Sequence, residues 1–255
     1  MRADQLLVDR GLAASRSQAQ RLIASGVQWR VGAQAWQRIA KNGDVLPTQC
    51  ELQLLDNAEA RYVSRGGLKL EGALRDSGVS VHNMRCLDVG QSTGGFTDCL
   101  LQHGAAHVVG LDVGHGQLHA RLRADPRVVC VEHINARELQ ANDPRVPYAA
   151  DGFDVVVGDL SFISLTLVLP ALLTVLKPDG VLLMLVKPQF ELQPGLIGKG
   201  GIVRDAALYV QVEDRIREAC AALGLQVVGW LDSPITGGDG NREFFVQALR
   251  SATVI

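Results

Sequence analysis

Short apolar runs alternate with longer segments of helical periodicity from residue 85 to residue 250. Uncharged runs such as residues 181–186 (VLLMLV) predict strands that are buried on both faces, as in a parallel sheet. The alternation of strands and helices predicts a doubly wound, mainly parallel α/β sheet. The last two runs, LQVVGWLD and REFFVQAL, leave no room between them for a crossover helix. We therefore expect an antiparallel strand at the end of the sheet.

The first sixty residues predict a small α+β unit. One short helix is expected over residues 4–10, and a second opens at Ser15, whose hydroxyl can cap it. A β segment follows around residues 27–31. Asn42 and Gly43 are expected to supply the positive φ angles of a tight turn.

Length and composition indicate one large and one small domain. The chain has 255 residues, of which 47% are hydrophobic, enough to bury a substantial core. We expect domains over residues 1–60 and 65–250, joined by a linker over 61–64. No leader sequence is recognisable, and no apolar run approaches the roughly 18 residues of a membrane span. The five cysteines form no C-x-x-C pair, which favours reduced thiols in the cytoplasm over disulfides or a zinc site.

Charge is distributed unevenly along the chain. The formal net charge is −2, yet residues 1–50 carry seven basic and three acidic groups, and residues 61–85 carry five basic and two acidic groups. A basic amino-terminal third on a mildly acidic chain is a weak indication of a polyanionic partner. A solvated surface of mixed charge explains the same pattern.

The segment DVGQSTGGFT, residues 88–97, predicts a cofactor loop between a strand and a helix. The dinucleotide motif G-x-G-x-x-G is absent, because Ser92 stands where the second glycine belongs, so pyrophosphate binding is disfavoured. Asp112 ends the next strand, where an acid can accept the ribose hydroxyls of a nucleoside. This arrangement resembles an S-adenosylmethionine site. The residues that we expect to bind this cofactor are Asp88, Gly90, Ser92, Thr93, Gly94, Gly95, Phe96 and Asp112.

Lys187 directly follows the buried run 181–186. An unpaired ammonium costs several kcal/mol when it leaves water, so a lysine at this position is usually paired or functional. Ligands of open α/β sheets bind at the carboxyl ends of the strands. Lys69, Asp159 and Glu243 stand at places that this fold brings to the same edge, and we expect all four charged residues to face one cleft.

The chain resembles a known family over nearly its whole length. Residues 2–26 match the pattern of the RNA-binding module of ribosomal protein S-four, and the strings YVSRGGLKLEGAL, GDLSFISL, VKPQFE, GKGGIVRD and SPITGGDGNREFF resemble the TlyA-type (hemolysin A) family of ribosomal RNA 2′-O-methyltransferases, which have an FtsJ-like catalytic domain. The resemblance implies a Rossmann-like methyltransferase sheet, S-adenosylmethionine as cofactor and ribosomal RNA as partner, without membrane or metal. It also implies a catalytic tetrad of Lys69, Asp159, Lys187 and Glu243. Arg16 and Arg21 correspond to basic positions that such RNA-binding modules point at RNA phosphates, and we also expect Arg10, Arg65 and Lys199 to bind RNA.

The residue types of this tetrad suit transfer to a ribose hydroxyl, which must lose its proton as it attacks a methyl group. We assign Lys187 as the base, with Lys69 stabilising negative charge or holding the ribose and the two acids orienting the lysines. Burial and a second cation favour a neutral lysine, which is the form a base requires. The short termini are similar to those of family members that modify large-subunit RNA, so large-subunit RNA is the expected substrate. Methylation of small-subunit RNA is left open.

Other interpretations of the sequence remain open. The string DLSF at residues 159–162 resembles the D-P-P-Y motif of enzymes that methylate base amines, although an amine needs no lysine base. A noncatalytic RNA-binding factor and a membrane-lytic hemolysin are further alternatives. Against the hemolysin, the sequence shows no long amphipathic basic helix of the kind that binds membranes. His115 and His119 have the spacing of a helical metal pair, but we interpret them as surface residues. Trp29 and Trp36 could stack on bases, although packing roles are favoured.

Overall fold

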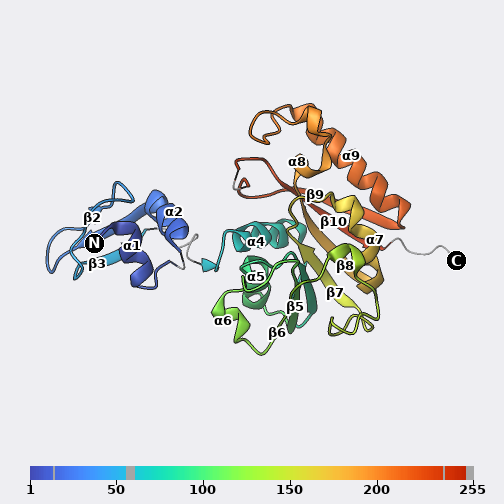
Figure 1. Ribbon diagram of the computed structural model, residues 1–255, viewed down its shortest axis with the longest axis horizontal. Coiled ribbons are helices and arrows are strands. Elements are labelled where there is room, and N and C mark those ends of the chain that lie inside the picture. Colours follow the sequence, from blue (N-terminus) through green and yellow to red (C-terminus); the bar gives the residue numbers. More distant parts are fainter. Residues whose placement is uncertain (14, 56–60, 238, 251–255) are drawn as a thin grey trace. The chain divides into compact units, whose positions relative to one another are not determined.

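The computed structural model describes residues 1–13, 15–55, 61–237 and 239–250. The chain divides into two compact units, Met1–Leu68 and Lys69–Ile255 (Figure 1). The expected domain boundary at residue 60 falls outside the described residues. In the predicted linker, 61–64, the Tyr62 side chain is buried, with 3% of its surface exposed. The division between the units lies a few residues further on, inside a helix, and the domain limits stay a prediction.

The amino-terminal unit is a small α+β fold, as the sequence predicts. Its sheet has the order β2-β1-β3 and is antiparallel throughout. The Ser15 hydroxyl accepts a hydrogen bond from the Gln18 amide (3.2 Å) and so caps the second helix. Leu6, Leu22 and Val27 belong to its buried core. The elements are α1 (Ala3–Asp9), α2 (Arg16–Gly26), β1 (Val27–Arg30), β2 (Gln37–Arg38) and β3 (Glu51–Leu54).

The turn before residue 45 differs from the prediction. Asn42 and Gly43 are not among the residues with positive φ. The Asp44 carboxylate instead accepts hydrogen bonds from the backbone amides of Ala40 (3.0 Å) and Lys41 (2.9 Å). A side-chain acceptor therefore closes this turn without a left-handed residue.

The larger unit contains a seven-stranded sheet with the order β6-β5-β4-β7-β8-β10-β9. β4 to β8 pair in parallel, whereas β10, the last strand of the chain, is antiparallel to both β8 and β9, as predicted. It lies between these two strands, so β9 and not the antiparallel strand forms the edge of the sheet. The strands are β4 (Arg85–Val89), β5 (His107–Leu111), β6 (Val128–Val131), β7 (Phe153–Gly158), β8 (Leu176–Val186), β9 (Leu225–Asp232) and β10 (Phe244–Arg250). The helices are α4 (Gly66–Ser77), α5 (Gly95–Gln102), α6 (Ala120–Arg123), η1 (Ala136–Glu138), η2 (Leu165–Leu167), α7 (Leu169–Val175), α8 (Pro188–Glu191), η3 (Pro194–Leu196) and α9 (Ala206–Ala222).

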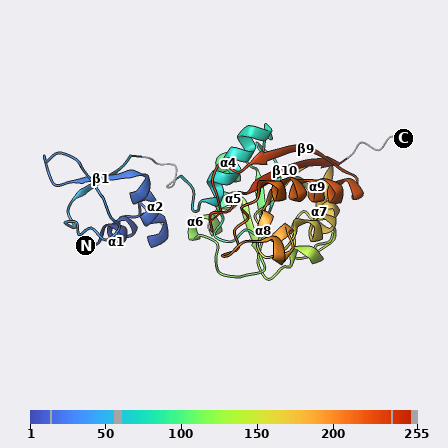
Figure 2. The same ribbon diagram turned by 90° about the horizontal axis from the view of Figure 1, so that it is seen from above.

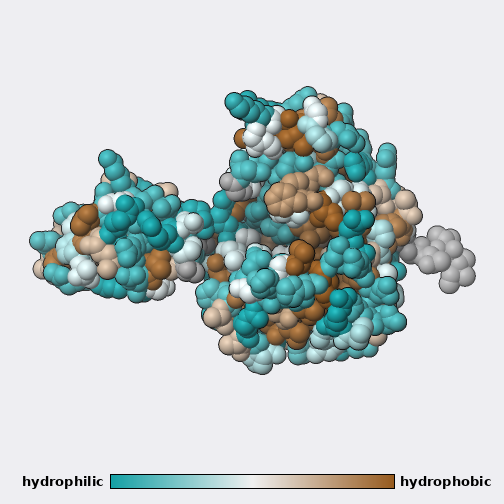
Figure 3. Space-filling model, viewed as in Figure 1, coloured by the Kyte–Doolittle hydropathy of each residue, from teal (hydrophilic) through white to brown (hydrophobic). Residues whose placement is uncertain are grey.

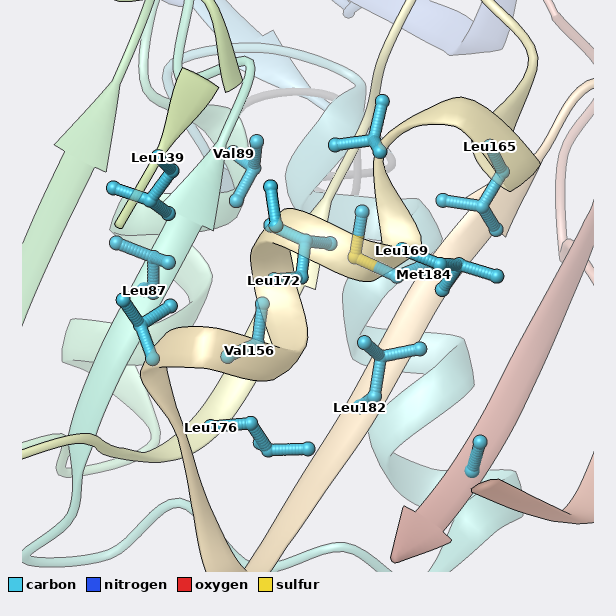
Figure 4. Close-up of a cluster of buried hydrophobic side chains, with 14 of the residues drawn as sticks. Leu87, Val89, Leu139, Val156, Leu165, Leu169, Leu172, Leu176, Leu182 and Met184 are labelled. Carbon is cyan, nitrogen blue, oxygen red and sulfur yellow. The ribbon is translucent and has the colours of Figure 1, made fainter. Parts of the chain in front are cut away.

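Helices cover both faces of this sheet (Figures 1 and 2). Alternate strand residues point to opposite faces, so Leu87 and Leu182 face the leucines of α7, as Figure 4 shows. On the opposite face Phe96 of α5 stacks on Phe245 of β10, with ring centroids 6.0 Å apart. Because both faces are buried, the central strands consist mainly of apolar residues.

Strand register brings the ends of three strands to one edge. Gly158 at the end of β7 pairs with Met184 of β8, and Phe244 at the start of β10 pairs with Val186. The residues immediately beyond these positions therefore emerge side by side. Among the described residues, no helix is long and apolar enough to span a membrane.

Candidate active site

The four predicted tetrad residues lie together at this edge and form a chain of ion pairs. Lys187 Nζ lies 2.6 Å from Asp159 Oδ1. Lys69 Nζ lies 3.7 Å from Asp159 Oδ2 and 2.6 Å from Glu243 Oε2. Asp159 directly follows β7, Lys187 follows β8, Glu243 precedes β10, and Lys69 lies in α4. The two cations therefore share one carboxylate between them.

The tetrad becomes more exposed from Glu243 towards Asp159. The side chains of Glu243 and Lys69 are 2% and 9% exposed, whereas those of Lys187 and Asp159 are 12% and 24% exposed. Burial raises the pKa of the Glu243 carboxyl, and the adjacent Lys69 ammonium opposes that rise. Lys187 and Asp159 thus lie at the open end of the cluster, where a substrate can approach.

One cavity, of about 200 Å³, lies beside the predicted cofactor loop. Gly90 and Asp112 are the predicted cofactor residues that line it. Asp112 accepts hydrogen bonds from the backbone amides of Ser92 (2.7 Å) and Gly114 (2.7 Å), which fix the carboxylate at the cavity. Its apolar walls include Val89, Leu111, Val113, Ile134, Leu160 and Val168. A carboxylate with an apolar wall fits the ribose and base of a nucleoside cofactor.

The loop around residue 94 needs glycine. Gly94 has φ +93° and precedes α5 as its N-cap. A Cβ atom here would lie 2.4 Å from Leu122 Cδ1 and 2.7 Å from Leu118 Cδ1. Any larger residue would combine backbone strain with a clash. The adjacent Ser92 and Thr93 are exposed, and Gly95 is buried as the first residue of α5.

Two of the predicted cofactor residues lie beneath the loop. Asp88 is 1% exposed and accepts a hydrogen bond from the Thr97 hydroxyl (2.7 Å). Burial raises its pKa to about 7. Phe96 is 4% exposed and packs on β10. These contacts turn both side chains inward, away from a bound cofactor. Asp88 and Phe96 would therefore affect cofactor binding indirectly, by supporting the loop above them.

Gln91 also turns inward. Its side chain is 3% exposed and donates a hydrogen bond to the Thr97 hydroxyl (2.9 Å). It lies so close to Gly110 in β5 that a Cβ atom there would be 1.9 Å from the Gln91 Cδ atom. A glutamine fits this position because the facing strand residue has no side chain.

A second cavity, of about 400 Å³, lies next to the tetrad. Lys187, Glu243 and Ser161 line it. The Phe162 ring is 90% exposed and lies 5.2 Å from the Phe190 ring between centroids. The remaining lining residues are Gln189, Ile197, Gly201 and Asp239. Figure 3 shows hydrophobic surface through the middle of the larger unit, bordered by hydrophilic side chains.

Sequence reasoning missed the functional setting of Ser161, Phe162 and Asp239. The sequence assigns Ser161 no role, but the structure places Ser161 Oγ 2.8 Å from Lys187 Nζ, as a hydrogen-bond acceptor. Phe162 has φ +63°, unusual for an aromatic residue. Ser161 and Phe162 lie within three residues of Asp159, and this closeness in sequence was the available sign that they belong to the site. Asp239 lies far along the chain and carried none.

The predicted RNA-binding residues fall in both units. Arg10 is exposed and donates to the Thr48 and Cys50 carbonyls. Arg16 is 61% exposed and forms an ion pair (2.9 Å) with the buried Asp4, whose pKa is lowered chiefly by its hydrogen bond with Arg2. Arg21 and Arg65 are half-buried, and Lys199 is exposed between η3 and α9. Their RNA-binding role stays a prediction.

The weaker signals have local explanations. Trp36 packs under the Arg30 guanidinium, 4.5 Å from the ring centroid, and Trp29 packs on the core of its unit. His119 caps α6 by accepting a hydrogen bond from the Arg121 amide, and His115 stacks on another histidine. Within the described ranges, no group of three or more His, Cys, Asp or Glu side chains could hold a metal ion.

The sheet order with its antiparallel seventh strand, and the acid-lined cavity at its carboxyl edge, define a methyltransferase that uses S-adenosylmethionine. Solved S-adenosylmethionine-dependent methyltransferases at 15% and 17% identity share this fold, each with a TM-score of 0.50. The FtsJ-like methyltransferase family matches residues 62–250. The chain belongs to this family, and within it to the TlyA type.

Three relatives support the narrower grouping. The 16S/23S rRNA (cytidine-2′-O)-methyltransferase TlyA of Mycobacterium tuberculosis is 45% identical over 99% of this chain and 90% of its own length. Hemolysin A of Brachyspira hyodysenteriae is 39% identical over 98% of this chain and all of its own. A solved Streptococcus thermophilus protein, provisionally named a hemolysin, is 40% identical and covers all of this chain and 91% of its own, with a TM-score of 0.74.

Proposed function

We propose that this protein methylates a ribose 2′-hydroxyl of ribosomal RNA, with S-adenosylmethionine as methyl donor. The observation that carries the proposal is the pair of lysines on either side of Asp159, beside a cavity large enough for a nucleoside. The Mycobacterium tuberculosis relative is named for the same reaction. Methylation of a base amine would leave the lysine base without a task, so the ribose is favoured.

The residues fit the cofactor as well. Asp112 would hold the ribose hydroxyls, the apolar walls of the smaller cavity would hold the adenine, and Gly90 would allow close approach. When bound, the cofactor supplies a methyl group on a positively charged sulfur, which becomes neutral as the methyl group leaves. Ser161 lines both cavities, so the methyl group would cross near this residue.

Lys187 is assigned as the base. It lines the larger cavity and lies at the open end of the tetrad. As the O–CH₃ bond forms, the proton of the 2′-hydroxyl would pass to the neutral Lys187 amine, leaving an ammonium next to Asp159. Lys69, held by Glu243 and Asp159, would keep a positive charge close to the developing negative charge.

The amino-terminal unit is assigned to RNA binding. Its arginines would contact phosphates, which gives affinity without reading sequence. Replacing Arg16 and Arg21 together by alanine should weaken RNA binding and lower the slope of log Kd against log salt by about one for each lost phosphate contact. An unchanged slope in a filter-binding titration would remove these two residues from the interface.

The target is assigned to large-subunit RNA in the cytoplasm, where ribosomes are assembled, with small-subunit RNA as a second candidate because the Mycobacterium tuberculosis relative is named for both. The test is methyl transfer from labelled S-adenosylmethionine to unmodified 50S and 30S subunits, with the nucleosides separated by mass spectrometry. A 2′-O-methylnucleoside from 50S subunits is expected. Methyl groups on a base would show an amine methyltransferase, and no transfer to either subunit would contradict the proposal.

A further inference from the structure

Ser161 is the side chain that links the two cavities to the tetrad. It lines both the cofactor-side cavity and the larger cavity. Its hydroxyl oxygen accepts a hydrogen bond from Lys187 Nζ (2.8 Å). It lies two residues after Asp159, whose Oδ1 atom is 2.6 Å from the same nitrogen. One short loop therefore supplies two oxygen partners to a single amine.

The geometry of a tetrahedral amine gives these contacts a consequence. Apart from its bond to carbon, the Lys187 nitrogen has three positions, and a neutral amine fills two of them with hydrogens and one with its lone pair. The Ser161 hydroxyl accepts one N–H group of this nitrogen, and the Asp159 carboxylate, which forms an ion pair with the same nitrogen at 2.6 Å, attracts the other. The lone pair is then left in the third position. In this arrangement the amine is oriented before the substrate arrives.

We propose that Ser161 is a positioning residue that, with Asp159, fixes the direction of the Lys187 lone pair towards the target hydroxyl. This inference rests on the proposed function. During the reaction the hydroxyl proton moves to the lone pair, the O–CH₃ bond forms and the donor's S–CH₃ bond breaks. Ser161 neither gains nor loses a proton. Its hydroxyl keeps one N–H of Lys187 away from the path of the transferred proton.

Lys69 has a different set of partners. Its ion pairs are with two carboxylates, Glu243 and Asp159. Ser161 contributes a neutral oxygen at the other lysine. The two lysines of the tetrad therefore differ in their partners, since the Ser161 hydroxyl bonds to Lys187 and a second carboxylate, that of Glu243, pairs with Lys69.

The test compares Ser161→Ala with Ser161→Thr, which keeps a hydroxyl. Loss of a hydrogen bond to an ionisable group, worth about 1.5–3 kcal/mol, should lower kcat roughly 10- to 100-fold in Ser161→Ala. KM for the ribosomal subunit and Kd for S-adenosylmethionine should stay within about twofold. Ser161→Thr should recover most of the lost kcat. The control is Ser80→Ala, since Ser80 is exposed and precedes the amino end of β4, away from the carboxyl edge.

Thermal unfolding of each variant separates a local effect from misfolding. A folded Ser161→Ala variant with unchanged kcat would overturn the inference. So would an equal loss of cofactor affinity, which would make Ser161 a cofactor-binding residue, or a folded Ser161→Thr variant without recovery. If the unsubstituted protein methylates no ribose, the proposed function fails and this inference with it. The other outcomes bear on Ser161 alone.

Discussion

The Lys69 ammonium lies 2.6 Å from the Glu243 carboxylate, and these side chains are only 9% and 2% exposed. Two charges so far from water lose much of their hydration, and their mutual attraction must offset that loss. Glu243 directly precedes β10 and Lys69 lies in α4. The ion pair therefore joins two distant segments of the chain at the candidate active site.

Glu243→Gln should destabilise the larger unit by about 3 kcal/mol, because it leaves Lys69 with only the more distant Asp159 carboxylate. Urea unfolding measures the change. Adding Lys69→Met should restore part of the stability but no activity. The matched control is Glu213→Gln, which breaks a more exposed pair with Arg217 and should cost less than about 1 kcal/mol. A cost for Glu243→Gln as small as that of the control would contradict the account.

Asp112→Ala should weaken S-adenosylmethionine binding roughly 10- to 100-fold, since charged hydrogen bonds contribute about 1.5–3 kcal/mol each. Its carboxylate also orders the loop through the Ser92 amide, so part of the loss comes from that segment. Isothermal titration of the folded protein measures the affinity. Asp214→Ala, an exposed position on α9, serves as control. Equal affinities for the two variants would remove Asp112 from the cofactor site.

Gly110→Ala should destabilise the protein by about 1–3 kcal/mol, because the new methyl group would overlap the buried Gln91 amide. In a protein that already carries Gln91→Ala, adding Gly110→Ala should cost much less stability than it does in the unsubstituted protein. A double-mutant cycle in urea unfolding measures this coupling. Additive effects would mean that the cost of Gly110→Ala does not arise from the Gln91 side chain, and would contradict this prediction.

Much of the fold follows from local patterns. The strands around Leu87 and Leu182 carry mainly apolar residues at their centres because helices cover both faces of the sheet, and such apolar runs can be recognised in the sequence. The turn at Asp44 was mispredicted because Asn42 and Gly43 favour positive φ, but a carboxylate acceptor allowed another geometry. Local propensity could not show which side chain would close the turn.

The site was predictable where it depends on topology. Asp159 and Lys187 end neighbouring strands, so their meeting follows from the strand order. The direction of a side chain does not follow in this way. Asp88 and Phe96 lie in the expected loop, yet their side chains pack inward on contacts from other segments.

Asp88 should make stability depend on pH. Burial raises its pKa to about 7 in the folded protein, from an ordinary value of 3.8. Between these values the folded state binds the proton that the unfolded state has lost, so stability should fall as pH rises from about 4 to 7. This pKa shift corresponds to a change of roughly 4 kcal/mol at most in the free energy of unfolding. Urea unfolding of Asp88→Asn at several pH values should show a flatter profile, and Asp214→Asn should keep the original slope. Parallel profiles for all three proteins would contradict the assignment.

The central claim is that Lys187 removes the proton of a ribosomal ribose hydroxyl. The most direct measurement is methyl transfer to unmodified 50S subunits by the unsubstituted protein, Lys187→Ala and Lys187→Arg, with nucleosides identified by mass spectrometry and cofactor affinity measured alongside. We predict a 2′-O-methylnucleoside from the unsubstituted protein only, because alanine lacks an amine and arginine stays protonated, while S-adenosylmethionine affinity changes by less than about threefold. Ribose methylation that persists in Lys187→Ala would contradict the account.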